Sequence, residues 1–337
     1  MTTPAPVPAS PQPATPRGSV PDSAVLAEVV RSGFVEGRHR GSLVVLAADG
    51  SVEADLVLGD PTRPVFPRSS NKPMQAAAVL RTGLALDGEL LALAAASHSA
   101  ETFHLDAVRT ILAGAGLTVD ALQTPPSLPL DEAESEAWIR SGGHPEPILM
   151  DCSGKHAAML AACVARGWDT ATYLDPAHPL QRQVLSTFEQ LTGETVPAVG
   201  TDGCGAPLLA TSLVGLARAF RAIVLAEPGT PERRVADAMR AHPEYVAGTR
   251  RIDTWLMRGV PGAMSKMGAE AVQAVALADG RALAFKIDDG AYRAVGPVLA
   301  AVLGRMGVEA DGDTLSRIAS APLYGGGRPV GAVRAAF

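Results

Sequence analysis

A serine and a lysine stand three residues apart in the stretch RSSNKPMQAAAVL, residues 68–80. On a helix, residues i and i+3 share one face, so the Ser69 hydroxyl would come within reach of the Lys72 amine. A buried lysine can lose its proton and act as a general base toward a serine. The alternative is an ordinary helix start with Ser69 or Ser70 as the N-cap. Pro73 disfavours a helical conformation at Lys72, so this stretch taken alone favours the ordinary helix start.

Two other stretches carry polar residues between small or apolar ones. In AAASHSAE, Ser97 and His98 follow an Ala/Leu run, a position that often lines a cleft, although Ser97 could equally cap the helix that includes Phe103. In PGAMSKMGAE, Lys266 stands two residues before Gly268. This element is loosely similar to the Lys-Thr-Gly of penicillin-recognising serine enzymes, in which a lysine faces the nucleophile. Taken alone, a surface lysine is the simpler interpretation.

Two thiols lie close to other metal-binding residue types. MDCSGKHAAML and GTDGCGAPLL contain Asp151, Cys152, Lys155, His156, Asp202 and Cys204. Reduced thiols with nearby Asp and His suit a first-row metal ion, zinc above all. Each segment supplies one cysteine rather than a Cys-x-x-Cys pair, so the pattern is not a zinc finger. The alternative is that both cysteines are small core residues, the interpretation we give to Cys163.

The elements that must position these residues follow from hydrophobic periodicity. SLVVLAADGSVEADLVLG predicts a hairpin around Asp49-Gly50, and AVQAVALADGRALAFKID predicts a second around Asp279-Gly280. Helical patterns cover residues 74–86, 90–96, 104–117, 154–167 and 294–307. Hairpins at both ends with helices between predict an α/β (α+β) fold, in which terminal strands share one antiparallel sheet flanked by helices.

Composition limits the function classes. The chain has 337 residues and a net charge of −6, which disfavours a nucleic-acid partner. No stretch is long and apolar enough for a membrane span, and we find no signal peptide, so we expect a cytoplasmic protein with reduced cysteines. Residues 1–22 are rich in Pro, Ala, Thr and Ser and predict a disordered tail. We expect residues 23–337 to form a single catalytic domain of one or two lobes.

Five segments in order resemble one family, the class 3 (Rhizobium-type) L-asparaginases, also called the asparaginase II family. They are RSSNKPMQA, ASHSAE, CSGKHAAML, GTDGCGAP and HPEYVAGTRRIDTWLMRGVPGAMSKMGAE, and the match runs from about Phe34 to Val333. The resemblance implies the fold of serine β-lactamases and bacterial glutaminases. It also implies hydrolysis of L-asparagine to L-aspartate and ammonia by a homodimer.

Members of this family carry two Ser-Lys pairs in one site, and these fall on Ser69 with Lys72 and on Ser97 with Lys266. The sequence does not rank the two pairs. The resemblance also implies a zinc site, which is not strictly catalytic, with Cys152, Lys155 and Cys204 as ligands. We expect substrate contacts at Arg68, His98 and Asp202.

Two other functions stay open on the residues alone. One is a β-lactamase-like serine hydrolase, or an amidase for another amide, suggested by Ser-x-x-Lys and by Lys266. The missing export signal and the lack of a true Lys-Thr-Gly count against it. The other is a non-catalytic zinc-binding protein in which Cys152 and Cys204 hold structure and the serines cap helices.

Overall fold

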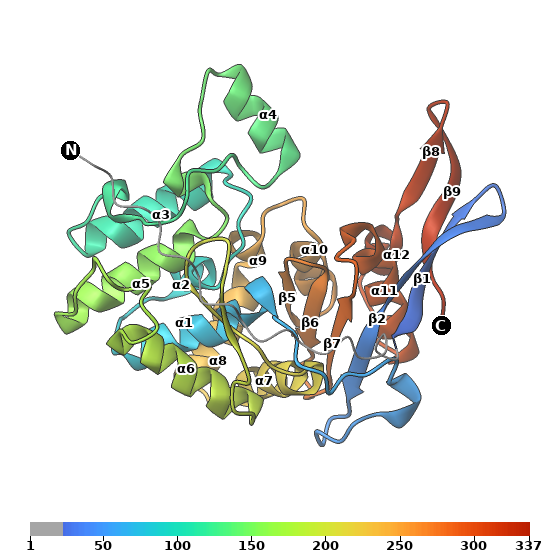
Figure 1. Ribbon diagram of the computed structural model, residues 1–337, viewed down its shortest axis with the longest axis horizontal. Coiled ribbons are helices and arrows are strands. Elements are labelled where there is room, and N and C mark those ends of the chain that lie inside the picture. Colours follow the sequence, from blue (N-terminus) through green and yellow to red (C-terminus); the bar gives the residue numbers. More distant parts are fainter. Residues whose placement is uncertain (1–22) are drawn as a thin grey trace, which may run out of the picture.

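The computed structural model describes residues 23–337 (Figure 1). The predicted tail, residues 1–22, lies outside the described residues. The main sheet has seven antiparallel strands in the order β5-β6-β7-β2-β1-β9-β8. Its strands are β1 (Ala24–Arg31), β2 (Phe34–Leu46), β5 (Met264–Gly268), β6 (Val272–Ala276), β7 (Ala282–Ile287), β8 (Pro322–Gly325) and β9 (Arg328–Ala335). Strands from both ends of the chain thus share one antiparallel sheet, as predicted.

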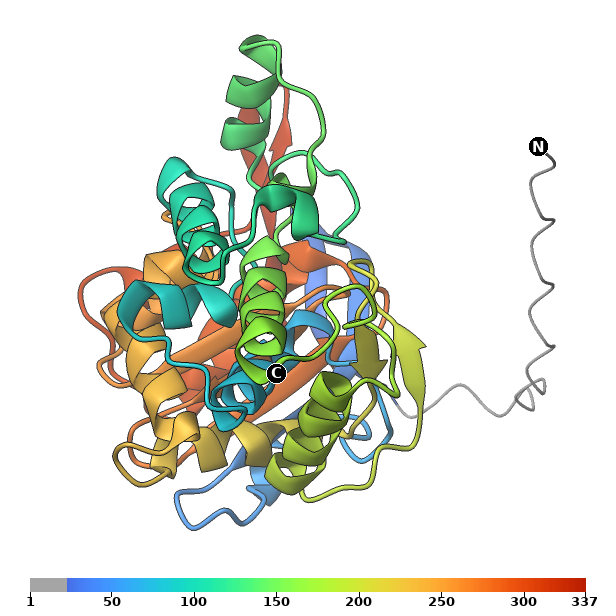
Figure 2. The ribbon, with the colours of Figure 1, turned by 90° about the vertical axis from the view of Figure 1, so that its left-hand side faces the viewer.

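Helices cover both faces of this sheet (Figure 1). One face packs against a large helical layer, which Figure 2 shows in front of the strands. This layer contains α1 (Lys72–Arg81), α2 (Gly88–Ala94), α3 (Thr102–Gly114), α5 (Ser153–Arg166), α6 (Pro179–Thr192), α7 (Leu213–Leu225), α8 (Pro231–Ala241) and α9 (Pro243–Val246). The other face packs against α10 (Ile252–Gly259), α11 (Val295–Arg305) and α12 (Thr314–Ala319). The predicted sheet flanked by helices is confirmed.

The strand period of two explains how one sheet serves two cores. In β2, Val44 and Leu46 belong to the core of the larger helical layer, whereas Leu43 and Val45 belong to the core around α11. Successive side chains of a strand point to opposite faces. A strand buried on both faces is therefore apolar at every position, which is why residues 43–46 form an unbroken apolar run.

Two further elements lie outside these layers. The short strands β3 (Val199–Thr201) and β4 (Pro207–Leu209) form a separate antiparallel pair. Helix α4 (Glu132–Arg140) has no buried residue and projects beyond α3 and α5 (Figure 1). Within residues 23–337, no helix combines the length and apolarity that crossing a membrane requires.

The first predicted hairpin forms only in part, whereas the second is confirmed. Strand β2 pairs with β1 and β7, and residues 51–58 meet it only through the isolated bridges Leu46–Val52 and Leu43–Leu58. After the turn the chain enters a short 3₁₀ helix, Ala54–Leu56, which interrupts any ladder. The second hairpin is β6 and β7, paired from Val272–Lys286 to Ala276–Ala282.

The start of α1 differs from the sequence prediction in two ways. Lys72 is helical, with φ −61° and ψ −35°, because the preceding 3₁₀ turn Arg68–Asn71 already leads the chain into the helix. Pro73 is tolerated there because first-turn N–H groups have no intrahelical partner. Neither Ser69 nor Ser70 caps α1, and Ser97 does not cap α3. The helix-cap interpretation of these serines is therefore wrong.

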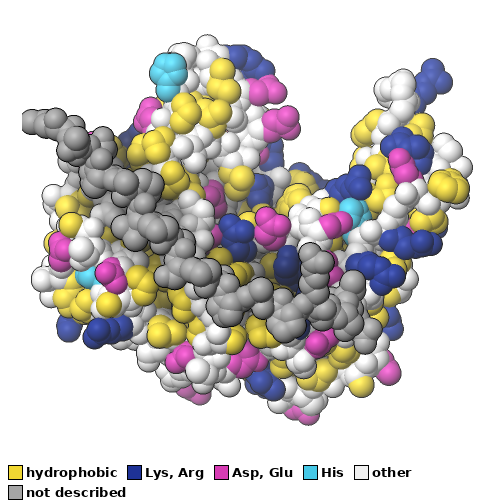
Figure 3. Space-filling view, viewed as in Figure 1, with side chains coloured by type: hydrophobic (Ala, Val, Ile, Leu, Met, Phe, Trp, Pro, Cys, Tyr) yellow, Lys and Arg dark blue, Asp and Glu magenta, His cyan; other side chains and the backbone are white. Residues whose placement is uncertain are grey.

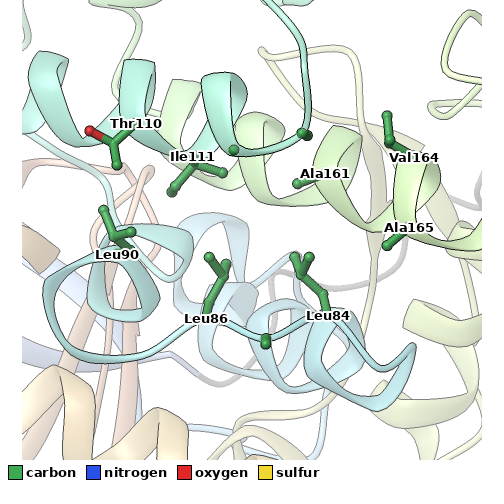
Figure 4. A pocket seen from close by; sticks show the side chains of 11 residues that line it. Leu84, Leu86, Leu90, Thr110, Ile111, Ala161, Val164 and Ala165 are labelled. Carbon is green, nitrogen blue, oxygen red and sulfur yellow. The ribbon is translucent and has the colours of Figure 1, made fainter.

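An apolar cavity of about 380 Å³ lies between α3, α5 and the segment that joins α1 to α2 (Figure 4). It is lined by Leu84, Ala85, Leu86, Leu90, Thr110, Ile111, Gly114, Ala115, Ala161, Val164 and Ala165. None of the residues with predicted chemistry belongs to this lining. Its wall lacks any charged group, so the predicted catalytic residues lie elsewhere in the fold.

Candidate active site

Two buried lysines converge on the hydroxyl of Ser97. Lys72 Nζ and Lys266 Nζ each lie 2.9 Å from Ser97 Oγ. Lys72 is the first residue of α1, Lys266 is in the middle of β5, and Ser97 follows α2. The structure thus brings three of the four predicted catalytic residues into direct contact. The expected pair of Ser97 with Lys266 is formed, whereas Lys72 contacts Ser97 rather than Ser69.

The charges around this hydroxyl make the two lysines different. Burial lowers the pKa of Lys266 to about 7, and the charge of Lys72 acts in the same direction, against the carboxylate of Asp253. Burial also acts to lower the pKa of Lys72, but Cys152 and the Asp151 carboxylate, whose oxygen is 3.5 Å from Nζ, outweigh it and raise that pKa. Near neutral pH, Lys72 is the charged partner and Lys266 is the one that can be neutral.

A buried carboxylate fixes the strand that carries Lys266. Asp253 accepts hydrogen bonds from Ser265 Oγ at 2.7 Å, from Met267 N at 2.9 Å and from Gln273 Nε2 at 3.0 Å. The first two donors flank Lys266 in the chain. Asp253 therefore holds β5 on both sides of the lysine and is a positioning residue that lies outside the predicted set.

Ser69 lies at the wall of a cavity of about 400 Å³ that also reaches Ser97. Its side chain is buried except for a small exposed fraction, 9%, and within residues 23–337 its hydroxyl makes no hydrogen bond. By contrast, Ser70 is fully buried and donates to the Lys266 carbonyl at 3.0 Å. Of these two adjacent serines, Ser69 is the one that a bound molecule can reach.

Arg68, just before this serine, has a strained backbone. Its φ is +50°, a region that non-glycine residues seldom adopt and that clusters at functional sites. Its guanidinium is held by Asp202 Oδ1 at 2.8 Å. The ion pair and the buried turn that follows offset the cost of this conformation, and so fix the direction in which the Ser69 side chain leaves the backbone.

The cavity wall includes residues that the sequence analysis did not select. It is formed by Ser69, Ser97, Leu130, Asp151, Arg251, Met267, Ala269 and Tyr292. Figure 3 shows basic and acidic side chains together in the hollow between the projecting α4 and β8–β9 segments. Arg251 lies within one of the five matching segments, so its neighbourhood was a usable signal. Tyr292 lies outside all of them, and only the fold brings it to the site.

The three predicted substrate contacts have different positions. His98 is fully buried, its Nε2 is 2.9 Å from Ser153 Oγ, and its Nδ1 accepts from Ala100 N at 3.2 Å. Both ring nitrogens are thus occupied, and His98 is not in the cavity wall. Arg68 lines a neighbouring cavity of about 450 Å³ together with Glu270 and Lys286. The structure pairs Arg68 with Asp202 but does not bring either one into the wall around Ser97.

The predicted zinc ligands form a buried cluster. Cys152, Lys155 and Cys204 are each at most 4% exposed, and Lys155 Nζ donates to Cys204 Sγ at 3.1 Å. A hydrogen bond from Cys152 and the positive charge of Lys155 hold the pKa of the Cys204 thiol well below its usual range. The same hydrogen bond and burial raise the pKa of Cys152. The cluster is therefore a thiolate stabilised by one thiol and one ammonium.

This donor set fits a zinc ion if the lysine takes part. In the described part of the chain, no group of three His, Cys, Asp or Glu side chains could hold a metal. The two sulfurs are donors that zinc prefers, and Lys155 adds a nitrogen donor once its ammonium loses a proton. Next to this cluster, the buried Nε2 of His156 has no hydrogen-bond partner among residues 23–337. The buried, sulfur-rich cluster thus has an imidazole nitrogen beside it.

Comparisons with known proteins give a family and two structural likenesses. The model of the family described as L-asparaginase II matches residues 27–335. No curated protein sequence matches the chain. A Bacillus glutaminase crystallised with 4.3 M NaCl is 12% identical, with a TM-score of 0.43 over 80% of this chain and 91% of that one. A β-lactamase from Mycobacterium bovis is 15% identical, with a TM-score of 0.42 over 79% and 94% of the two chains.

Proposed function

Since this chain belongs to the L-asparaginase II family, which supports amidohydrolase chemistry, we propose that it hydrolyses L-asparagine to L-aspartate and ammonia. The observation that carries the proposal is the convergence of two buried lysine amines on Ser97 Oγ, at 2.9 Å each, in a cavity that Ser69 also lines. Amines buried beside hydroxyls are the means by which a protein without a catalytic histidine can activate a serine. A homodimer in the cytoplasm is part of the same proposal.

In this mechanism Ser69 attacks the side-chain amide carbon of asparagine. Lys72 accepts the Ser69 proton as it passes one of its own to Ser97, and Ser97 passes its proton to neutral Lys266. The new C–O bond forms, the C–N bond breaks, and ammonia leaves with a proton returned along the same path. Water then hydrolyses the ester, which releases L-aspartate and restores the Ser69 hydroxyl.

Access and bonding favour Ser69 as the attacking group. The Ser97 hydroxyl already bonds both lysines, which leaves it suited to carrying protons between them. The Ser69 hydroxyl has no competing partner in the described part of the chain and lies on the same wall. In 3₁₀ geometry, residues i and i+3 are eclipsed, so the turn Arg68–Asn71 directs Ser69 toward the side of Lys72. Catalytic hydrogen bonds often shorten only when substrate is bound.

The function is tested by ammonia release from L-asparagine, with L-glutamine and the chromogenic β-lactam nitrocefin as competing substrates. We expect turnover of asparagine, because Ser69 and Ser97 share the cavity wall with the charged groups of Asp151 and Arg251. Hydrolysis of nitrocefin without release of ammonia from asparagine would instead establish a β-lactamase-like hydrolase. If the purified protein acts on none of the three, the asparaginase proposal and the β-lactamase alternative both fail, and a non-catalytic zinc-binding protein becomes the better account.

We also propose that Cys152, Lys155 and Cys204 hold a zinc ion. When bound, zinc would act as a Lewis acid that orients the substrate, because the serines already supply a nucleophile. The protein's part is to keep these three donors together in a buried cluster, which includes the residue after Asp151. Lys155 must lose its proton to bind the metal, so metal binding releases a proton from the cluster.

The zinc proposal predicts a difference between two cysteine variants. The purified full-length protein should contain stoichiometric zinc by elemental analysis. Cys204→Ser should lose most of that zinc, because it removes the thiolate that Lys155 contacts. Cys163→Ala is the matched control, since Cys163 is equally buried but lies in the core on α5. Zinc that is absent at neutral pH, with no change in KM for Cys204→Ser, would contradict the assignment.

A further inference from the structure

Arg251 is a cationic side chain without an anionic partner. It is partly buried immediately before α10 and lines the same cavity as Ser69 and Ser97. Within residues 23–337 its guanidinium makes neither a hydrogen bond nor an ion pair, and it lies over the ring of Tyr292, 6.0 Å from the ring centroid. A guanidinium presents five N–H donors in a fixed fork that matches a carboxylate. Its donors therefore face the cavity unused.

Two other arginines near Arg251 in the chain form ion pairs. Among these three, the lack of an ion pair within residues 23–337 is therefore specific to Arg251. Arg250 bonds Asp131 at 2.7 Å and Glu134 at 2.6 Å, and so ties this loop to the start of α4. On α10, Arg258 bonds Glu244 at 3.0 Å.

The backbone around Arg251 is held from several directions. Glu101 accepts from Thr249 N and from Thr249 Oγ1, both at 2.8 Å. Trp255 Nε1 donates to the Thr249 carbonyl at 3.1 Å. A side chain on such an anchored loop loses little freedom when it binds a ligand, so the site is preorganised.

The wall of the cavity also contains a negatively charged group, the carboxylate of Asp151. Asp151 belongs to the same wall, and its side chain is 23% exposed although its carboxylate also contacts Lys72. One accessible cation, one accessible carboxylate and the hydroxyl-bearing side chains of Ser69, Ser97 and Tyr292 thus surround a single cavity. This arrangement matches a zwitterion that carries an amide: an amino acid with α-carboxylate, α-ammonium and a side-chain carboxamide.

We propose that Arg251 binds the α-carboxylate of the substrate, with Asp151 facing the α-ammonium, so that the site selects free amino-acid amides. This inference rests on the proposed amidohydrolase function and deepens it. A charge-assisted pair between guanidinium and carboxylate gives both affinity and orientation, because two parallel N–H···O bonds fix the plane of the carboxylate. The amide carbon is then held at one place relative to the two serines.

Three amides test the proposal. L-Asparagine carries both charged groups, succinamate lacks the α-ammonium, and 3-aminopropanamide lacks the carboxylate. Arg251→Gln should lower kcat/KM by about 10- to 100-fold for the two substrates with a carboxylate, mainly through KM. The same variant should change kcat/KM for 3-aminopropanamide by less than about threefold, because Arg251 has nothing to bind there. Arg251→Lys should restore part of the loss, since a point charge replaces the fork.

Arg258→Gln is the matched control. It removes an exposed arginine from α10, the helix that follows Arg251, and should leave kcat/KM unchanged for all three amides. An equal loss on all three amides for Arg251→Gln would make the arginine structural and overturn the inference, while asparagine hydrolysis itself stands. If the wild type hydrolyses none of them, the proposed function fails instead. Calorimetric binding of L-aspartate to wild type and to Arg251→Gln then decides on Arg251, and equal affinity would overturn its role.

Discussion

Replacement of Ser69 by alanine should reduce kcat for L-asparagine by about 10⁴-fold or more and leave KM nearly unchanged. Loss of a nucleophile removes the covalent route entirely, and what remains is the rate supplied by binding and by the lysines. The substitution deletes one oxygen that has no hydrogen bond among residues 23–337, so the fold should be unaffected. Ammonia release in the steady state measures the effect.

Ser70→Ala is the informative comparison for this variant. Ser70 is adjacent in the chain and equally small, but its hydroxyl bonds the Lys266 carbonyl and does not line the cavity. It should cost about 1 kcal/mol of stability and keep most of the turnover. Mass spectrometry of quenched reactions should find the acyl group on the peptide that contains Ser69. Near-normal turnover by Ser69→Ala would transfer the nucleophile's role to Ser97.

We expect Lys266 to set the pH dependence of kcat/KM and to be, after Ser69, the second residue that is essential for activity. Its pKa, lowered to about 7 by burial, means that the neutral amine predominates above pH 7. Because the relay needs that neutral form, kcat/KM for asparagine should rise as pH rises through about 7 and then level off. The groups that set this midpoint are Lys72 and Arg251, which lower it, and Asp253 and Asp151, which raise it.

Two substitutions of Lys266 separate proton acceptance from charge. Lys266→Met should lower kcat by about 10²–10⁴-fold, the usual contribution of a positioned base. Lys266→Arg keeps a positive charge but cannot accept a proton near neutral pH, so it should lose a comparable factor. If the arginine variant keeps high activity, Lys266 acts through its charge, and the pH limb belongs to another group. Lys286→Met, on β7 and in the wall of a different cavity, should change neither kcat nor the pH midpoint.

Much of the fold was predictable because its signals are local. The turn at Asp279-Gly280 and the alternation around it predicted β6 and β7. The hairpin at Asp49-Gly50 is reduced to two antiparallel bridges, because β2 pairs with strands from elsewhere and residues 54–56 fold into a 3₁₀ helix. A turn signal says that the chain reverses, but not which strand finally occupies the adjacent edge.

The sequence by itself determined the residue types of the site and the family to which they belong, since five ordered motifs are preserved in composition and spacing. Only the tertiary structure decided which of these side chains are in contact. Ser97 lies between Lys72 and Lys266 because α1, the end of α2 and β5 pack together. Burial lowers the pKa of Lys266 to about 7, whereas Cys152 and Asp151 outweigh burial at Lys72 and raise its pKa. The sequence placed Arg251 within a family motif, but it did not reveal that the Arg251 guanidinium has no hydrogen-bond partner among residues 23–337. Desolvation and unsatisfied hydrogen bonding belong to the packed molecule, and no short stretch of sequence encodes them.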